Sequence, residues 1–531
     1  MREFEPSLRS KLSQADIRGI RARGMNLQEL HKEMQTLVRG APHIRLIRAC
    51  RPRDGIRRIS PSRRAQLIGR YAERDSGLRV SKFVAASGAA TRMFHIPSAC
   101  LSKGLVTGEA IESAARQGAD DAREMRRLLR NLERFAFIED LRLEMRRRGL
   151  ILDDLLAKGR YNEVLEALLA PDGLNYARLP KALIPFHLYA EGPRTPLEEH
   201  LIEGCDYLRD REGRVRVHFT VPSDFLMSAR GHVSAAKKRF RQPGVRFVIS
   251  FSVQERATDT IACDMAGWPA RDSNGGLLFM QSGHGALLDN LGKTRSDLVF
   301  LRTIDNVLPE RLNHITVDCR RMLGGYFLEL QDQANSLMEA LSECRTGDRL
   351  LRRAEEFIES EFSSRFPDAY RQAPARSRAG VLMDRLNRPL RVCGMVRLKG
   401  GRGGRPFWVA DPDGTESLQI VEGAQVDMHT PGQRAIWAST DYFNPADMVC
   451  GLQDYRGNYF DLREFRDPQA GFITLKSVAG QQVKVLERPG LWNGGMARWN
   501  TVFVEIPAAT VHPVKSILDL LDPWHRVQST L

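Results

Sequence analysis

Apolar and polar positions divide the chain into helical and extended stretches. Residues 13–39 carry apolar side chains at roughly helical spacing, and the pattern stops at Gly40, so it predicts a helix. Runs rich in β-branched and aromatic residues predict strands at 43–50, 78–86, 214–221, 245–251, 277–280 and 298–304. Predicted helices at 194–209 and 228–240 separate several of these runs. This alternation predicts an α/β protein with a largely parallel sheet covered by helices.

Two further regions depart from that alternation. Residues 107–170 are helix-rich and crowded with charge, with Gly149 and Pro171 as breakers, and they lie in a long insertion at 98–178. From about residue 380 the runs are short and separated by Gly, Pro and Asn, which predicts a more antiparallel half closed by a helix near 513–521. We therefore expect a mainly helical extension at 1–79, an α/β core at 80–379 that contains the insertion, and a second half at 380–531.

Composition excludes several classes of protein. Of the 531 residues, 42% are hydrophobic and 27% are charged, which is ordinary for a globular protein. The eight cysteines are scattered without a C-x-x-C pair, so neither a disulfide framework nor a zinc site is expected. No apolar run is long enough to span a membrane, and the amino terminus lacks an apolar signal stretch, so we expect a cytoplasmic protein with no membrane partner.

Positive charge is concentrated at the amino end of the chain. The net charge is +15, and residues 1–100 hold 21 Lys and Arg against 8 Asp and Glu. Such asymmetry is typical of an arm that binds nucleic acid. The same stretch has few aromatic residues for stacking on bases, so solvated basic helices are the favoured interpretation and nucleic-acid binding is the alternative.

The first segment with a chemical signature follows the predicted strand at 78–86. Small residues there, Ala86, Ser87, Gly88 and Ala89, precede Ala90-Thr-Arg92-Met. Small residues between a strand and a helix let the backbone approach a phosphate, whose charge suits the N–H groups of the helix start. No Gly-Lys-Ser/Thr follows, so this is not a P-loop, and packing alone also explains such a turn.

Three later segments add candidate polar groups. Lys181 follows a proline and begins a stretch, 181–186, that is predicted to be extended; there it could reach a phosphate or simply lie at the surface. His284 stands between Gly283 and Gly285, which suits either close approach to a ligand or an ordinary turn. The strand at 298–304 ends in Asp305-Asn306, which places a carboxylate at the carboxyl edge of the sheet, where α/β proteins bind ligands and where Mg²⁺ finds oxygen ligands.

The carboxyl-terminal half holds the remaining motifs. They are Lys399-Gly-Gly-Arg-Gly-Gly-Arg405, Glu422-Gly-Ala-Gln-Val426, Phe443-Asn444, Trp492-Asn493 and Pro513-Val-Lys515. The glycine–arginine piece has only two arginines between strand-like sequences, so it is interpreted as a loop and not as an RNA-binding box. For Glu422 and Asn444, a role in a turn or a helix cap explains the sequence as well as a ligand-binding role does.

Taken in order, these segments resemble the UDP-sugar pyrophosphorylases, the eukaryotic-type UTP–glucose-1-phosphate uridylyltransferases and their relatives. That family has A-G-G-x-G-T-R-L, P-K, G-H-G or G-N-G, a strand ending in D-N, K-G-G, E-x-A-Q-V, F-N-x-N and P-V-K-x-x-x-D-L-L. The chain resembles even more closely a bacterial family known as domain of unknown function 4301, whose members share phrases such as Ser87-Gly-Ala-Ala-Thr-Arg-Met93 and Leu491-Trp-Asn-Gly494. The first resemblance covers residues 86–521 and the second nearly the whole chain.

The resemblance implies a fold and a reaction. The fold is a Rossmann-like mixed sheet of the nucleotide-diphospho-sugar transferase (GT-A) type, and the reaction joins a nucleoside triphosphate, UTP in that family, to a sugar-1-phosphate and releases pyrophosphate. Residues 86–89 and 283–285 would bind the nucleotide, and Arg92, Lys181 and Lys515 would act on the phosphates. Asp305 would hold Mg²⁺. Glu422, Asn444 and Lys399 would contact the sugar.

Departures from the family pattern leave the substrate open. Ser87 and Ala90 replace two loop glycines, and Pro-Ala-Asp follows Asn444 where the family has Thr-Asn-Asn. A same-fold glycosyltransferase is a rival, although its usual D-x-D motif occurs only as Asp411-Pro-Asp413, which resembles a turn. The base, the sugar and the oligomeric state are not set by these patterns.

Two placements follow if the resemblance holds. Arg92, Lys181, Asp305 and Lys515 should converge despite their separation along the chain. Both ends of the insertion at 98–178 should return to the nucleotide site. We therefore expect its apolar side chains to pack onto the core beside that site and form a partial roof: Leu128, Leu129, Phe135, Phe137 and Ile138.

Overall fold

The computed structural model describes residues 12–74, 77–88, 90–343, 347–397, 403–411, 414–478 and 481–527. Two compact units are present, and both are discontinuous in sequence. The first contains residues 1–80, 254–301 and 320–508, and the second contains residues 81–253, 302–319 and 509–531. These boundaries differ from the three consecutive segments expected from the sequence, and that expected division stays a prediction.

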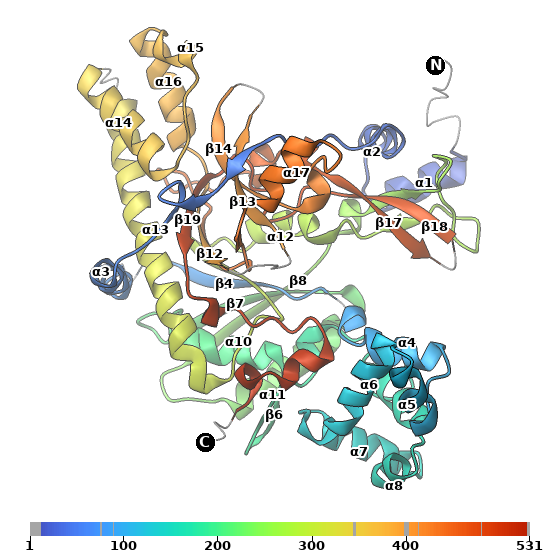
Figure 1. Ribbon diagram of the computed structural model, residues 1–531. Coiled ribbons are helices and arrows are strands. Elements are labelled where there is room, and N and C mark those ends of the chain that lie inside the picture. Colours follow the sequence, from blue (N-terminus) through green and yellow to red (C-terminus); the bar gives the residue numbers. More distant parts are fainter. Residues whose placement is uncertain are drawn as a thin grey trace. The chain divides into compact units, whose positions relative to one another are not determined.

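The second unit is built on three parallel strands, β4 (Val80–Ala85), β7 (Arg214–Val221) and β8 (Arg246–Val253). Lys82 pairs with Val217, and Val217 pairs with Ile249. α10 (Pro196–Cys205) packs against β7, and α11 (Leu226–Arg239) packs against β8 (Figure 1). α10 begins where Thr195 and Glu198 form a capping box, which satisfies free N–H groups of the first turn. A short hairpin, β5 (His187–Tyr189) and β6 (Gly192–Arg194), precedes α10.

The expected bounds of the insertion, 98–178, stay a prediction, but the second unit does contain a run of helices in this region. This run consists of α4 (His95–Ser102), α5 (Gly108–Arg116), α6 (Asp120–Arg130), α7 (Ile138–Arg147), α8 (Leu152–Ala157) and α9 (Asn162–Leu169), and Figure 1 shows the labelled helices α4–α8 gathered in one bundle. Phe94 contacts Tyr176 with ring centroids 5.4 Å apart, and Phe137 meets Tyr176 edge-on at 5.5 Å. Leu128, Phe135, Phe137 and Ile138 are buried in this cluster and Leu129 packs against it half-buried.

That apolar cluster is not confined to the insertion. It continues into Val307, Val514 and Ile517, which come from the two other segments of the second unit. The Ile517 N–H also donates to the Met93 carbonyl at 3.0 Å. The apolar side chains of the insertion therefore pack onto the core of this unit as expected, whereas a roof over a nucleotide stays a prediction.

The first unit contains a mixed sheet. Its central strand β12 (Leu390–Arg397) is antiparallel to β15 (Tyr442–Phe443) and to β16 (Met448–Gly451), and β16 is antiparallel to β11 (Leu298–Thr303). On the other side β12 is parallel to β19 (Asn500–Glu505), which is followed by β3 (Gly55–Arg57) and β2 (Arg51–Pro52). The carboxyl-terminal half is thus largely antiparallel, as expected, except for the parallel β12–β19 pair.

Two smaller sheets and several helices complete the first unit. One sheet contains β1 (Leu46–Ala49), β13 (Arg405–Ala410) and β14 (Glu416–Val421), and the other contains β10 (Phe279–Met280), β9 (Thr260–Cys263), β18 (Gln481–Glu487) and β17 (Phe472–Val478). Its helices include α3 (Pro61–Ala72), α12 (Leu287–Gly292), α14 (Asp348–Glu361), α15 (Asp368–Arg371), α16 (Ala375–Leu386) and α17 (Pro431–Ala438). The long α13 (Asn313–Ser342) begins in the sequence of the second unit and ends in that of the first.

Three local predictions were wrong. The helix expected at 13–39 is two helices, α1 (Gln14–Ala22) and α2 (Leu27–Arg39), because Gly24 takes a φ of 74° and Asn26 caps a new helix. The extended stretch expected at 181–186 begins with a 3₁₀ turn, Lys181–Leu183. The helix expected near 513–521 is a 3₁₀ turn, Ile517–Leu521, started by the Ser516 and Asp519 capping box.

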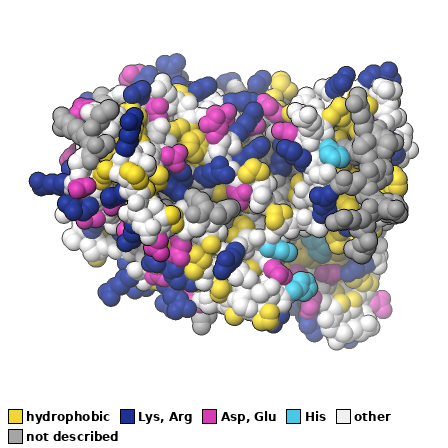
Figure 2. Space-filling view, turned by 90° about the horizontal axis from the view of Figure 1, so that it is seen from above, with side chains coloured by type: hydrophobic (Ala, Val, Ile, Leu, Met, Phe, Trp, Pro, Cys, Tyr) yellow, Lys and Arg dark blue, Asp and Glu magenta, His cyan; other side chains and the backbone are white. Residues whose placement is uncertain are grey.

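Many basic side chains of the first 100 residues are paired within the first unit. Ion pairs join Arg23 to Asp259, Arg57 to Glu361, Arg58 to Glu505, Arg63 to Glu329 and Arg70 to Asp332. Figure 2 shows Lys and Arg interspersed with Asp and Glu on the face in view and not gathered into one patch. Both observations support solvated, paired basic side chains over a nucleic-acid arm. None of the described helices is long and apolar enough to cross a membrane.

Candidate active site

One carboxylate gathers two distant lysines in the second unit. Asp305 Oδ2 accepts hydrogen bonds from Lys181 Nζ at 2.9 Å and from Lys515 Nζ at 2.8 Å, although these lysines lie 124 and 210 positions away in sequence. Lys181 and Lys515 therefore meet at Asp305. The predicted convergence of these three residues with Arg92 on one pocket stays a prediction.

Backbone hydrogen bonds hold the carboxyl-terminal segment against the Asp305-Asn306 turn. The Val514 N–H donates to the Asp305 carbonyl at 3.0 Å, and Lys181 Nζ also donates to the Val514 carbonyl at 2.7 Å. The Asn306 side chain accepts from the His512 N–H at 2.9 Å and donates to the Thr510 carbonyl at 3.4 Å. The segment 510–514 is thus hydrogen-bonded to Asp305 and Asn306, and this places Lys515 next to the Asp305 carboxylate.

Asp519 fixes the backbone that carries Lys515. Its Oδ2 accepts from the N–H groups of Lys515 at 2.7 Å and Ser516 at 2.8 Å. Sequence reasoning missed this role, although the Ser516-x-x-Asp519 spacing is the signature of a capping box and could have indicated it.

The two lysines differ in exposure. The side chains of Asp305 and Lys181 are 8% and 10% exposed, whereas that of Lys515 is 62% exposed. Burial opposes ionisation of Asp305, but the ammonium groups of Lys181 and Lys515 outweigh it and hold the pKa of the carboxyl below its usual range. Burial lowers the pKa of Lys181, and the charge of Asp305 opposes that shift. A charged carboxylate is therefore fixed beside one buried and one accessible lysine.

Asp305 Oδ1 is the oxygen available to a metal ion. It is buried and has no hydrogen-bond partner among the described residues. No group of three or more His, Cys, Asp or Glu side chains in the described ranges is placed to hold a metal by itself. One carboxylate oxygen nevertheless fits Mg²⁺, which is commonly held by one or two carboxylates together with substrate phosphates.

The small-residue turn after β4 is tied to the segment that carries Lys181. The Ala90 N–H donates to the Leu179 carbonyl at 3.0 Å, and the Lys181 N–H donates to the Gly88 carbonyl at 3.5 Å. The Ala86 N–H donates to both the carbonyl and the Oγ1 of Thr220, each at 3.1 Å. The turn therefore lies beside Lys181 in the second unit. Ala89 lies outside the described residues.

The departures from glycine cause no backbone strain in this turn. Neither Ser87 nor Ala90 has a positive φ, and a Cβ added at Gly88 would meet nothing within 4 Å. Gly88 is exposed and Ser87 is half-buried, so the turn presents backbone to solvent. Arg92 is exposed in the 3₁₀ turn Ala90–Arg92, and its guanidinium makes no hydrogen bond or ion pair with a described residue. Its predicted contact with phosphate stays a prediction.

A second polar cluster forms in the first unit around His284. The imidazole stacks on Trp492 with ring centroids 4.0 Å apart, and its Nδ1 accepts from the Leu491 N–H at 2.9 Å. That bond leaves the proton on Nε2, which lies 3.4 Å from Glu422 Oε1. His284 and Glu422 are thus brought together. Trp492 belongs to one of the sequence motifs, but the sequence predicted no function for it; the structure places it in this cluster.

The other predicted residues of the first unit that the structure describes have roles in packing or in backbone turns. Gly283 has a φ of 74°, which favours glycine, and a Cβ at Gly285 would lie 2.4 Å from the Pro489 carbonyl, so backbone conformation explains the first glycine and close packing the second. Asn444 is buried, donates to the Gly394 carbonyl at 2.9 Å and accepts from the Ala446 N–H at 3.0 Å. This geometry favours the turn role for Asn444. Lys399 lies outside the described residues.

The fold and these sites define an α/β protein with a buried carboxylate and two lysines beside a strand-to-helix turn. The chain belongs to the family described as Domain of unknown function (DUF4301), which matches residues 13–526. The family membership expected from the sequence is therefore confirmed. No curated protein matches the chain.

Solved structures similar to the chain are UDP-sugar pyrophosphorylases. One is a UDP-glucose pyrophosphorylase variant from Leishmania major in complex with UDP-glucose, with 12% identity over 96% of this chain and 78% of that one and a TM-score of 0.42. Another is the uridine diphosphate N-acetylglucosamine pyrophosphorylase from Trypanosoma brucei in complex with an inhibitor, with 12% identity over 96% and 79% and a TM-score of 0.45.

Proposed function

We propose that the protein is a nucleotidyltransferase that forms a nucleotide-sugar and pyrophosphate from a nucleoside triphosphate and a sugar-1-phosphate. The observation that carries the proposal is Asp305 Oδ2 held between Lys181 Nζ at 2.9 Å and Lys515 Nζ at 2.8 Å. The motif order from residue 86 to residue 521 supports it. UTP is the proposed nucleotide, since the resemblance is to uridylyltransferases.

The reaction is an in-line displacement at phosphorus. A phosphate oxygen of the sugar-1-phosphate attacks the α-phosphorus, a new P–O bond forms, and the bond to the β-phosphate breaks so that pyrophosphate leaves with the electron pair. The attacking oxygen is already anionic, so no general base is required. Catalysis then consists of positioning and of neutralising negative charge.

The lysines would divide this work according to their exposure. Lys515, 62% exposed, is free to move its ammonium group from Asp305 to a phosphate oxygen. Lys181, 10% exposed and also bound to the Val514 carbonyl, would stay in place and fix the carboxylate. The exposed backbone at Gly88 would contact phosphate through N–H groups, with Arg92 reaching the leaving pyrophosphate.

Asp305 Oδ1 is the atom that would hold Mg²⁺. The ion would supply charge neutralisation on the triphosphate. The unpartnered buried oxygen supports this assignment, because a buried carboxylate oxygen otherwise pairs with a donor.

In the first unit, His284 stacked on Trp492 would face the base, and Glu422 would accept a sugar hydroxyl. Asn444 and Lys399 are the other sugar contacts proposed by the resemblance. These roles are proposed from the motifs, and the His284–Glu422 distance of 3.4 Å supports their acting together.

The proposal is tested with the purified full chain. Each common nucleoside triphosphate is incubated with a panel of sugar-1-phosphates and Mg²⁺, and pyrophosphate release is measured. Release that needs both substrates is expected. Pyrophosphate production that is independent of the sugar-1-phosphate, or none with any pair, would contradict the proposal.

A further inference from the structure

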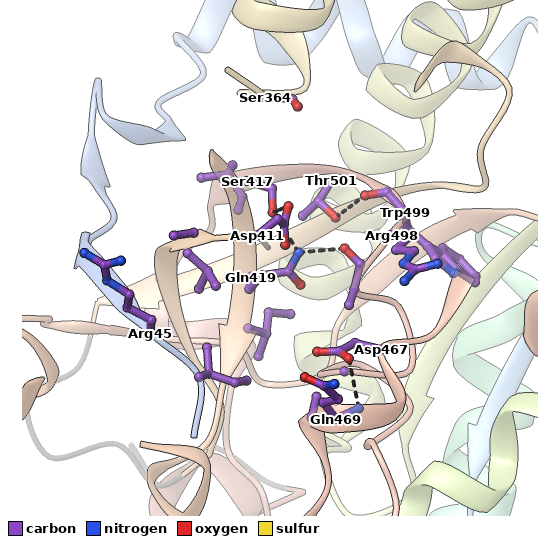
Figure 3. A pocket seen from close by; sticks show the side chains of 18 of the residues that line it. Arg45, Ser364, Asp411, Ser417, Gln419, Asp467, Gln469, Arg498, Trp499 and Thr501 are labelled. Carbon is purple, nitrogen blue, oxygen red and sulfur yellow. Dashed lines mark hydrogen bonds between the residues drawn. The ribbon is translucent and has the colours of Figure 1, made fainter. Parts of the chain in front are cut away.

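A large hollow in the first unit has no assigned role. It has a volume of about 1130 Å³ and is lined by the stretch before β1, by β13 and β14, and by segments near residues 384–388, 467–470 and 494–501 (Figure 3). Of the nucleotide-, metal- and sugar-binding residues predicted from the sequence, none that the structure describes lines it. The volume is slightly larger than the usual range of small-molecule sites, about 300 to 1,000 Å³, so it can hold a whole organic ligand.

Some charged groups in the wall are already paired within the protein. Arg388 forms an ion pair with Asp384, and Asp411 Oδ2 accepts from the Ser417 hydroxyl at 3.1 Å. Arg385 donates to the Thr415 hydroxyl at 2.8 Å. These residues shape the wall and need no ligand.

Four other polar side chains in the wall, those of Asp467, Gln469, Arg498 and Gln419, have unused bonding capacity. Asp467 accepts from the Gln469 N–H at 2.9 Å but has no cationic partner among the described residues. Arg498 is exposed, and its guanidinium makes no bond to a described residue. Gln419 Oε1 is buried without a partner, whereas its Nε2 is held by the Ala497 carbonyl at 2.6 Å. Figure 3 shows Asp467, Gln469 and Gln419 directed into the hollow, and Arg498 at its edge.

The chemistry of this set limits the ligand. Asp467 and Gln419 Oε1 only accept hydrogen bonds, whereas Arg498 only donates, so the ligand must offer donors and acceptors close together. Hydroxyl groups do both. A guanidinium is best matched by a phosphate or carboxylate. The apolar wall from Ile44, Phe362 and Leu418 suits the carbon skeleton of such a molecule.

We propose that this hollow is a second ligand site, which binds a phosphorylated or carboxylated sugar. The sugar hydroxyls bond to Asp467, Gln469 and Gln419, and the anionic group bonds to Arg498. The site belongs to the first unit alone, and this inference does not rest on the proposed nucleotidyltransferase reaction or on Asp305.

Calorimetric titration of the full chain tests the proposal with four probes: glucose 6-phosphate, gluconate, glucose and inorganic phosphate. Binding of glucose 6-phosphate or gluconate is expected, with glucose and inorganic phosphate each at least about tenfold weaker, because each lacks one half of the recognised chemistry. No binding of either sugar anion at millimolar concentration overturns the proposal. Equal affinity for inorganic phosphate also overturns it, since the site would then recognise an anion only.

Two variants with matched controls locate the binding. Arg498→Gln and Asp467→Asn each remove one charge, and the amide oxygen introduced by Asp467→Asn still accepts from the Gln469 N–H; both should weaken sugar-anion binding about tenfold. Arg18→Gln and Glu29→Gln make the same charge changes at exposed positions elsewhere in the first unit and should leave affinity unchanged. Lys515→Met, a change in the second unit that costs little stability, should also leave it unchanged. Wild-type affinity in both pocket variants, or loss in Lys515→Met, would place the ligand elsewhere and overturn the proposal.

Discussion

At the scale of single residues, the central feature is that the two carboxylate oxygens of Asp305 have different partners. Both lysines bind Asp305 Oδ2, and Oδ1 has no partner among the described residues. Lys181 and Asp305 are both buried, so each is the main compensation for the charge of the other. The Asp305 carboxylate therefore stabilises the fold through its ion pair with Lys181, and its Oδ1 can still bind a ligand.

Asp305→Asn and Lys181→Met should each destabilise the fold. Asp305→Asn leaves Lys181 buried without its countercharge, which costs about 3 kcal/mol. Lys181→Met leaves the buried Asp305 with only the exposed Lys515 as its countercharge, so its loss should be smaller. The double variant should lose less than the sum of the two single losses, by at least about 1 kcal/mol, because both charges are then absent. Urea unfolding of the four proteins measures this. Additive losses would show that the ion pair contributes little beyond each residue's own packing.

Lys515→Met should separate turnover from stability. The side chain is 62% exposed, so its ion pair contributes at most about 1 kcal/mol to folding. Loss of a cation that contacts the phosphates should lower turnover by at least about a hundredfold. Pyrophosphate release and urea unfolding are measured on the same preparation, and Lys476→Met in the first unit serves as the control for removing a half-exposed, paired lysine. Turnover near wild type would remove Lys515 from the mechanism.

At the scale of elements, the helical insertion and the carboxyl-terminal segment share one apolar cluster. Phe137 and Leu128 belong to the insertion, and Val514 and Ile517 flank Lys515 on either side. α6 also contacts the 3₁₀ turn Ile517–Leu521 directly. We therefore predict that a change in the position of Lys515 is transmitted to the insertion through these packed side chains.

Hydrogen exchange should show this coupling. Adding a nucleoside triphosphate should protect amides in 107–170 as well as those in the 86–93 turn, because the ligand would restrain the segment that carries Lys515. The measurement is repeated with Lys515→Met as the control, in which protection in 107–170 should fall. Protection confined to the turn would mean that the insertion is not a roof and is better explained as an interface.

At the scale of the whole molecule, two buried histidines should contribute to the loss of stability in acid. Burial lowers the pKa of His218 to about 4, and both of its ring nitrogens contact serine hydroxyls, those of Ser250 and Ser252, at 2.8 and 2.7 Å. Burial, with the nearby His187 and His512, lowers the pKa of His525 to about 3. Both values lie below the ordinary value of 6.5.

Stability should therefore fall as the pH falls from about 6.5 toward 4. In this window both histidines bind a proton in the unfolded chain but not in the folded chain. Their contribution to the free energy of unfolding is therefore fully present above the pKa of the unfolded chain and is lost as the pH falls below it. Two such groups give a slope of up to about 2.7 kcal/mol per pH unit. Urea unfolding at several pH values measures the slope, and His218→Gln should reduce it. His429→Gln is the control for replacing an exposed histidine; an unchanged slope in His218→Gln would contradict the prediction.

The sequence by itself determined the local elements and the residues worth testing. The runs that predicted strands at 78–86, 214–221, 245–251 and 298–304 correspond to β4, β7, β8 and β11, because period and β-branched content act between near neighbours. Lys181, Asp305 and Lys515 were found from motif order. Family membership also followed from sequence alone.

Only the tertiary structure decided which candidates meet and what each polar group does. The sequence did not distinguish Asn444 as a ligand from Asn444 as a turn residue, because the Gly394 carbonyl that it binds lies 50 positions away. The difference between buried Lys181 and exposed Lys515 likewise depends on the path of the chain around them. The hollow at Asp467 and Arg498 had no sequence signal, since its wall combines segments that are distant in sequence and share no motif. Local patterns fix elements, whereas burial and convergence depend on long-range packing that no single stretch of sequence contains.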